Sequence, residues 1–143
     1  MEPVFGQVGE VPRRNTCDGD NLSPALRWSD PPAGTRAQAV VVTDRDAAAT
    51  FFHWTLYDLP PRTRSLREGD APPGALEGRN SFGGAGYGGP CPPKGEKPHR
   101  YVFTVYALKR RLGLRAGASP SDVFSAVKES ATARGQVIGR FGR

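Results

Sequence analysis

Two histidines, one tyrosine and two aspartates are the residues of this chain whose types and spacing best suit chemistry. The histidines are His53, in FFHWT, and His99, in PHRYVF, and both lie in segments whose composition predicts β-strands. Because side chains alternate along a strand, His99 and Tyr101 share one face. The same spacing puts Asp44 and Asp46 on one side if the chain stays extended between them. These residues could therefore meet in one site.

Four interpretations of these residues stay open at this point. In the first, the histidines, the Tyr101 hydroxyl and the backbone N–H groups of a glycine-rich loop bind a phosphate or carboxylate. In the second, His53, His99 and Asp44 bind a metal ion, but no HxH, HExxH or CxxC spacing supports this, and we predict no metal site. In the third, Cys91 is a nucleophile with His99 as its base, although Cys91 lies between prolines and not at a helix N-terminus. In the fourth, the loop before His99 only covers the core.

Three segments that predict strands must position these residues. AQAVVVTD (37–44) and FFHWTLYDLP (51–60) are rich in β-branched and aromatic residues. YVFTVYAL (101–108) is apolar on both faces, which is typical of a central strand. The segment 61–89 between the last two is rich in glycine and proline and is predicted to be mostly loop.

One helix is predicted near the C-terminus, over SPSDVFSAVKESATARG (119–135). Ser119 is the expected N-cap, Asp122 completes a capping-box pattern, and Gly135 is the expected stop. QVIGRF (136–141) is then predicted to be a last short strand. The sequence therefore predicts a mainly β fold with one C-terminal helix.

Composition and charge exclude several classes of protein. With 143 residues, 18 glycines and 14 prolines, the chain is expected to form a single loop-rich β domain over residues 1–143. No apolar run approaches the ~20 residues of a transmembrane helix, and the first residues lack a signal-peptide core, so we expect a cytoplasmic protein. The net charge of +6 comes from scattered residues without an arginine-rich arm or an aromatic platform, so we expect no nucleic-acid partner.

The two cysteines, Cys17 and Cys91, are too few for a disulfide scaffold or a zinc cluster. In a cytoplasmic protein both are expected to be reduced thiols. A bridge between them stays open, because both flank motif segments and the sequence does not supply their distance.

Three ordered blocks resemble the signature blocks of the phosphatidylethanolamine-binding protein family, and most closely its bacterial Raf-kinase-inhibitor-like branch. The blocks are CDGDNLSPALRW (17–28), DRDAAATFFHWTLYDLP (44–60) and GYGGPCPPKGEKPHRYVFTVYAL (86–108). The resemblance implies a Greek-key antiparallel β-sandwich with a C-terminal helix. It also implies a small preformed pocket at one end of the sandwich, which binds phosphate-like anions and phospholipid headgroups.

The resemblance also assigns roles to particular positions. The implied ligand-binding residues are Asp44, Asp46, His53, Gly89, Pro90, His99 and Tyr101. Cys91 and Arg100 are expected to support the site. Because Arg100 faces away from His99 and Tyr101 on its strand, we hypothesise that it pairs with a residue of the acidic loop, such as Asp46. The acidic block departs from the family's usual Asp-Pro-Asp-Ala-Pro, because both prolines are missing from DRDAA, and this loop is therefore expected to be less preorganised.

An aspartate beside an anion is explained if its carboxylate raises the pKa of a histidine, so that a charged imidazolium meets the ligand. The sequence thus predicts a non-catalytic protein, without a cofactor, that binds a small anion or a phospholipid headgroup. Two alternatives stay open: a module that inhibits a kinase or hydrolase by protein contact, and a hydrolase that uses Asp44 and His99. The bacterial branch also suggests a homodimer.

Overall fold

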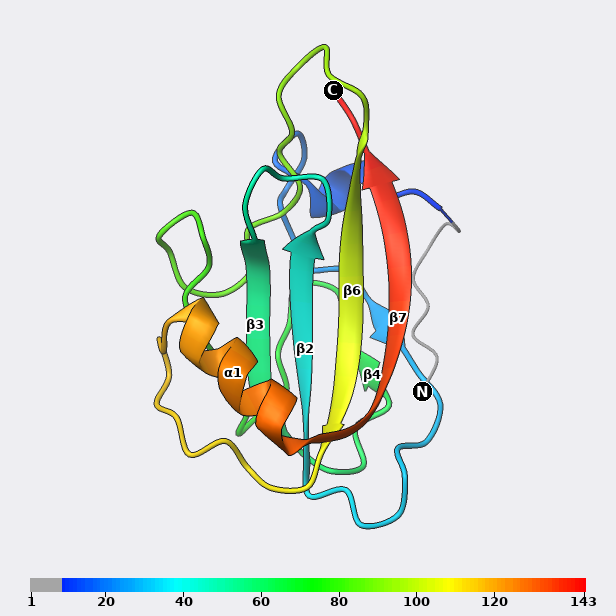
Figure 1. Ribbon diagram of the computed structural model, residues 1–143. Coiled ribbons are helices and arrows are strands. Elements are labelled where there is room, and N and C mark those ends of the chain that lie inside the picture. The colour runs from blue at the N-terminus through cyan, green and yellow to red at the C-terminus, as the bar shows by residue number, and fades with distance from the viewer. Residues whose placement is uncertain (1–8) are drawn as a thin grey trace.

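A five-stranded antiparallel sheet forms the body of the protein in a computed structural model that describes residues 9–143 (Figure 1). The strand order in this sheet is β5-β3-β2-β6-β7, and a second sheet pairs β1 with β4. The strands are β1 (Leu26–Arg27), β2 (Ala37–Asp44), β3 (Phe51–Leu59), β4 (Ser65–Leu66), β5 (Leu76–Glu77), β6 (His99–Leu108) and β7 (Ala131–Phe141). A short 3₁₀ helix, η1 (Arg13–Asn15), precedes them, and α1 (Pro120–Ser130) lies between β6 and β7. This confirms the predicted mainly β fold with one C-terminal helix.

The large sheet buries apolar side chains on both of its faces. Toward the small sheet, Trp54 and Phe103 pack with Leu26 and Leu66, and all four are buried. On the opposite face α1 lies across β3 (Figure 1), and its Val123 belongs to the second core cluster. Both faces of the sheet are covered, which agrees with the apolar composition of β2 and β6 over most of their length. For β6, the sequence predicted this.

The helix is shorter, and the last strand longer, than the sequence predicted. Ser119 caps α1 as expected, accepting the N–H of Asp122 at 3.2 Å. However, α1 ends at Ser130, and β7 begins at the next residue and pairs with β6 along its whole length. Gly135 therefore lies in the middle of a strand, opposite Val105. A long ladder of backbone hydrogen bonds outweighs the local helix propensity of these residues.

The strands that position the predicted site follow the sequence closely. β2 has the predicted bounds, β3 ends one residue earlier than predicted, and β6 begins two residues earlier, at His99. β6 lies between β2 and β7, so it is a central strand, as predicted. No helix in the described part of the chain combines the length and the apolar character needed to cross a bilayer.

Candidate functional site

One end of the large sheet gathers the side chains that the sequence singled out for chemistry. β2 ends at Asp44, which lies opposite Phe51 at the start of β3 and opposite Tyr101 near the start of β6. His53 and His99 are placed by the same two strand starts. The loop that precedes β6 rises over this end of the sheet (Figure 1). The antiparallel register therefore brings together residues that are up to 57 positions apart in the chain.

His99 is held by two carboxylates. Its Nδ1 donates to Asp44 Oδ2 at 2.7 Å, and its Nε2 lies 3.3 Å from Glu96 Oε1. The hydrogen bond with Asp44 raises the pKa of His99 above its ordinary 6.5, although partial burial opposes this. The Asp44–His99 contact is the pairing that the sequence led us to expect for one of the histidines. Glu96 was not predicted, because nothing in KGEKPH indicates where its side chain points.

His53 has the opposite character. It is 3% exposed, and burial lowers its pKa below the ordinary value. Its Nδ1 donates to the carbonyl oxygen of Gly88 at 2.6 Å, and a carbonyl oxygen can only accept. His53 is therefore neutral near pH 7 and has a lone pair on Nε2. The pKa values of the two imidazoles are thus shifted in opposite directions, which their sequence contexts did not indicate.

Tyr101 lies between the two imidazoles. Its ring stands edge-on to His53, with centroids 5.2 Å apart, and lies nearly parallel to His99, with centroids 6.4 Å apart. Burial, with the nearby charge of Asp44, raises the pKa of Tyr101, so its hydroxyl stays protonated. Within residues 9–143 this hydroxyl makes no hydrogen bond. An O–H donor without a partner is thus present beside the charged pair.

The loop before β6 is held to neighbouring segments of the chain by hydrogen bonds. The Gly88 N–H donates to the His53 carbonyl at 2.9 Å, and the Gly89 N–H donates to Asn21 Oδ1 at 2.8 Å. The Pro90 carbonyl accepts the N–H of Cys17 at 3.1 Å. The amides of Gly88 and Gly89 are therefore already used within the protein, and the anion-binding interpretation must rest on side chains.

Cys17 and Cys91 form a disulfide, which corrects the expectation of two reduced thiols. The segment around Cys17 lies against the loop before β6, because the Tyr87 hydroxyl donates to the Asn15 carbonyl at 2.6 Å. The sequence did not indicate this contact between distant segments, so it could not predict that the two cysteines lie close together. A sulfur in a disulfide is not a thiolate, so the interpretation of Cys91 as a nucleophile loses its chemical basis. Disulfides are typical of oxidising compartments, which runs against the predicted cytoplasmic location.

The expected pairing of Arg100 with Asp46 is present. Asp46 Oδ2 accepts from the Arg100 backbone N–H at 2.7 Å and from its Nε at 3.0 Å, and Oδ1 accepts from the second guanidinium nitrogen at 2.7 Å. Asp44 Oδ1 in turn accepts the Asp46 N–H at 2.8 Å. These contacts hold the turn that lacks the family's prolines. The carboxylate of Asp46 is thus hydrogen-bonded to Arg100, and Oδ2 of Asp44 is hydrogen-bonded to His99.

The Asp46–Arg100 contact predicts a specific acid response. The hydrogen bonds from Arg100 lower the pKa of Asp46 from 3.8 to about 2. A lowered pKa contributes stability that is present above about pH 4 and is lost as the pH falls through about 2. Thermal unfolding of Asp46→Asn and of Arg100→Ala should therefore show a smaller loss of Tm over this range than the wild type does. If Arg100→Ala lost as much Tm as the wild type over this pH range, the Asp46–Arg100 contact would not be the cause of the acid response.

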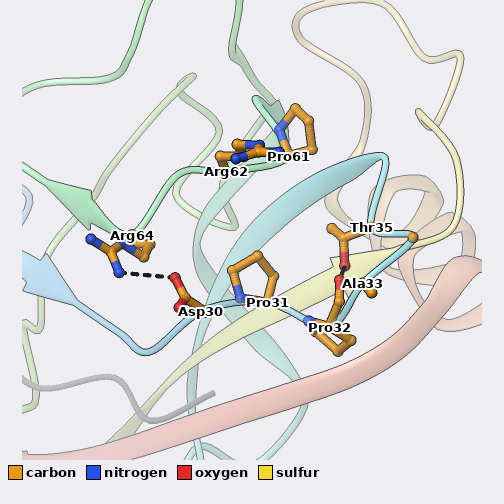
Figure 2. A pocket seen from close by; sticks show the side chains of 9 residues that line it. Asp30, Pro31, Pro32, Ala33, Thr35, Pro61, Arg62 and Arg64 are labelled. Atoms are coloured by element: carbon orange, nitrogen blue, oxygen red, sulfur yellow. Dashed lines mark hydrogen bonds and ion pairs between the residues drawn. The ribbon is translucent and has the colours of Figure 1, made fainter.

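A cavity of about 720 Å³ lies away from these residues, beyond the start of β2 and the end of β3 (Figure 2). It is lined by Asp30, Pro31, Pro32, Ala33, Gly34, Thr35, Pro61, Arg62 and Arg64. Figure 2 shows Arg64 and Asp30 as an ion pair on its rim, with an N···O distance of 2.9 Å. Both side chains are mostly exposed, and such pairs contribute little. None of the predicted site residues lines this cavity.

No cluster of three metal-ligating side chains occurs among residues 9–143. Asp44 and His99 bind each other, and His53 Nδ1 is used by a carbonyl oxygen. Of the four interpretations of the sequence, the anion site therefore has the most support from the geometry. Its strongest elements are one imidazole with a raised pKa, one imidazole with a lowered pKa and the Tyr101 hydroxyl, which has no hydrogen-bond partner in residues 9–143.

Comparison with known proteins places the chain in a family. A family model described as phosphatidylethanolamine-binding protein matches residues 2–142. A UPF0098 protein of Aquifex aeolicus is 44% identical over 146 residues, covering 97% of this chain and 85% of that protein. LppC of Mycobacterium tuberculosis, whose name includes the word lipoprotein, is 36% identical over 140 residues, covering 97% of this chain and 69% of that protein.

A solved structure agrees with the family match. The crystal structure of Escherichia coli YbcL, described as a new member of the mammalian PEBP family, is similar with a TM-score of 0.93 and 32% identity. The match covers 99% of this chain and 98% of that one. The resemblance that the three sequence blocks indicated is thereby confirmed, and the chain belongs to the phosphatidylethanolamine-binding protein family.

Proposed function

We propose that the protein binds a small anion, either a phosphate or a carboxylate, free or as part of a headgroup, between His99 and Tyr101. The observation that carries this proposal is the Asp44–His99 pair, which lies beside a Tyr101 hydroxyl without a partner. The proposal is one of binding without turnover and without a cofactor. It is supported by the disulfide between Cys17 and Cys91, which leaves no free thiol among residues 9–143 to act as a nucleophile.

The charges in the site suit a ligand with one or two negative charges. Asp44 is nearly buried, with its side chain 9% exposed, and it compensates the positive charge of His99. The imidazolium keeps a second N–H, on Nε2, and the neutral Tyr101 supplies an O–H. Hydrogen bonds from a charged donor are stronger than neutral ones, so His99 should provide most of the affinity.

Glu96 stands where such a ligand would bind. Its carboxylate is 3.3 Å from His99 Nε2, and its side chain is 55% exposed. A side chain this exposed can turn into solvent at small cost. We therefore assign Glu96 the role of an internal competitor that an anion displaces.

His53 would add selectivity and no charge. Because Nδ1 carries the proton, Nε2 can only accept a hydrogen bond. It would suit the hydroxyl of a singly protonated phosphate or an N–H group of a headgroup. A fully deprotonated anion would gain nothing from it.

Calorimetric titration with inorganic phosphate tests this function. Asp44→Asn and His99→Ala should weaken binding roughly tenfold to hundredfold, because each removes a charge-assisted hydrogen bond. Wild-type affinity should fall as the pH rises above the ordinary histidine pKa of 6.5, since the raised pKa of His99 means that its imidazolium is lost only at a higher pH. Glu96→Gln should bind more tightly than the wild type, whereas Glu129→Gln, an exposed carboxylate paired with Arg110, should not change.

The result that would contradict the proposal is an affinity that is constant with pH and unaffected by Asp44→Asn. The same titrations separate the alternatives predicted from the sequence. A module that inhibits a kinase or hydrolase through another surface would keep its partner after His99→Ala. A hydrolase that uses Asp44 and His99 would release product from phosphate or carboxylate esters, and the proposed binding protein would not.

A further inference from the structure

A second, less polar cavity borders the candidate site. It has a volume of about 370 Å³ and is lined by Cys17, Asn21, Asn80, Phe82, Gly84, Tyr87, Gly88, Gly89 and Cys91. Only Gly89 among these was predicted to bind the ligand directly. No charged side chain lines the cavity, and its walls are two aromatic rings, two amide side chains, a disulfide and glycine backbone.

The two amide side chains in the lining are turned toward the backbone. Asn80 Oδ1 accepts the N–H groups of Phe82 and Gly84 at 3.0 and 3.3 Å, and its Nδ2 donates to the Gly86 carbonyl at 3.0 Å. Asn21 Oδ1 accepts the Gly89 N–H. The polar atoms of the walls are thus largely used within the protein, and an apolar group is the occupant that the cavity suits.

Phe82 is the most exposed of the large hydrophobic side chains in residues 9–143, at 54%, and the other exposed one is Leu22, at 37%. Its loop is nevertheless fixed, because the buried Asn80 holds it by three hydrogen bonds and the ring lies on the backbone of Gly88. A Cβ at position 88 would come within 2.6 Å of this ring. An exposed ring on a fixed loop can bind an apolar group with little loss of conformational freedom.

Phe82 also connects the cavity to the charged pair. Its ring stands edge-on to that of His53, with centroids 5.4 Å apart. His53 contacts Tyr101 in the same way, and Tyr101 stacks on His99. A continuous row of four rings therefore runs from the wall of the cavity to the proposed anion position.

We propose that the ligand is an anion bearing one ring-sized apolar group, of which a phosphate monoester of an aromatic alcohol is the type, with that group in the cavity against Phe82. This inference rests on the proposed function, because it names the class of anion bound there. The volume is at the lower end of the range for ligand sites, which suits a single ring. The edge-to-face contacts that Phe82 already makes show the packing that such a ring would adopt.

The test compares two probes, inorganic phosphate and phenyl phosphate, by calorimetry. The wild type should prefer phenyl phosphate roughly tenfold. Phe82→Ala should lower this ratio of dissociation constants toward one, and Phe82→Trp should keep it. Leu22→Ala, which removes the other exposed hydrophobic side chain, should have the wild-type ratio. Thermal unfolding of each variant verifies that it is folded.

The outcomes separate the two proposals. A wild-type ratio near one, or an unchanged ratio in Phe82→Ala, overturns the role of the cavity and leaves anion binding intact. Equal binding of phenyl phosphate by the wild type and Asp44→Asn overturns the proposed function and leaves the cavity as an aromatic site. Binding of neither probe by the wild type overturns both.

Discussion

Replacement of Cys17 and Cys91 together by alanine is expected to lower the free energy of unfolding by roughly 4 kcal/mol. The disulfide joins residues 74 positions apart, and a crosslink that closes a loop of this length restricts the unfolded chain strongly. In the folded protein the partners already lie together, since the Cys17 N–H donates to the Pro90 carbonyl. The bond therefore acts mainly on the unfolded state.

Urea unfolding measures this effect directly. The double variant and the reduced wild type should have the same midpoint, which should lie well below that of the oxidised wild type. Reductant should leave the midpoint of the double variant unchanged, which serves as the internal control. A reduced wild type as stable as the oxidised one would show that the bridge contributes nothing.

Gly89→Ala is expected to cost about 3 kcal/mol of stability, because the loop at this position has no room for a methyl group. A Cβ there would come within 2.4 Å of the Asn15 carbonyl oxygen and 2.5 Å of Asn21 Oδ1. The first of these atoms belongs to the backbone and cannot rotate away. The loop would have to move, and the hydrogen bond between the Gly89 N–H and Asn21 would lengthen or break.

Gly84→Ala is the matched control for this prediction. It lies in the same glycine-rich region, and its Cβ would meet only Asn80 Nδ2, at an ordinary 3.9 Å. Chemical unfolding of the two variants should therefore show a large loss for position 89 and a small one for position 84. Equal losses would mean that chain flexibility, and not the close approach at Gly89, determines the effect.

The sequence predicted the elements whose signals are local. The β-branched and aromatic runs of β2 and β3 and the Ser119 cap of α1 were visible in a few consecutive residues, and the structure confirms them. The predicted end of α1 was wrong, because the helix ends where β7 begins to pair with β6, and that pairing is not local in the sequence. The residues around Gly135 do not indicate that this pairing extends back to Ala131.

The candidate site divides in the same way. The family blocks named His53, His99 and Tyr101, and the structure brings them together. Their pKa values depend on burial and on distant partners, so the sequence did not show that the pKa of one imidazole is raised and that of the other is lowered. Phe82 was missed because it lies in a glycine-rich loop, although the spacing NSF, with an asparagine two residues before an aromatic, is compatible with a turn that Asn80 caps.

Helix α1 and strand β7 follow each other directly, without a connecting loop that could absorb an inserted residue. No connecting residue follows Ser130, and after an irregularity at Thr132 β7 keeps one continuous register with β6, up to Phe141 opposite His99. One inserted residue at the junction would turn every β7 side chain to the other face of the sheet or lift the helix from its core. The junction at the opposite end of the sheet therefore constrains which β7 residue lies beside His99.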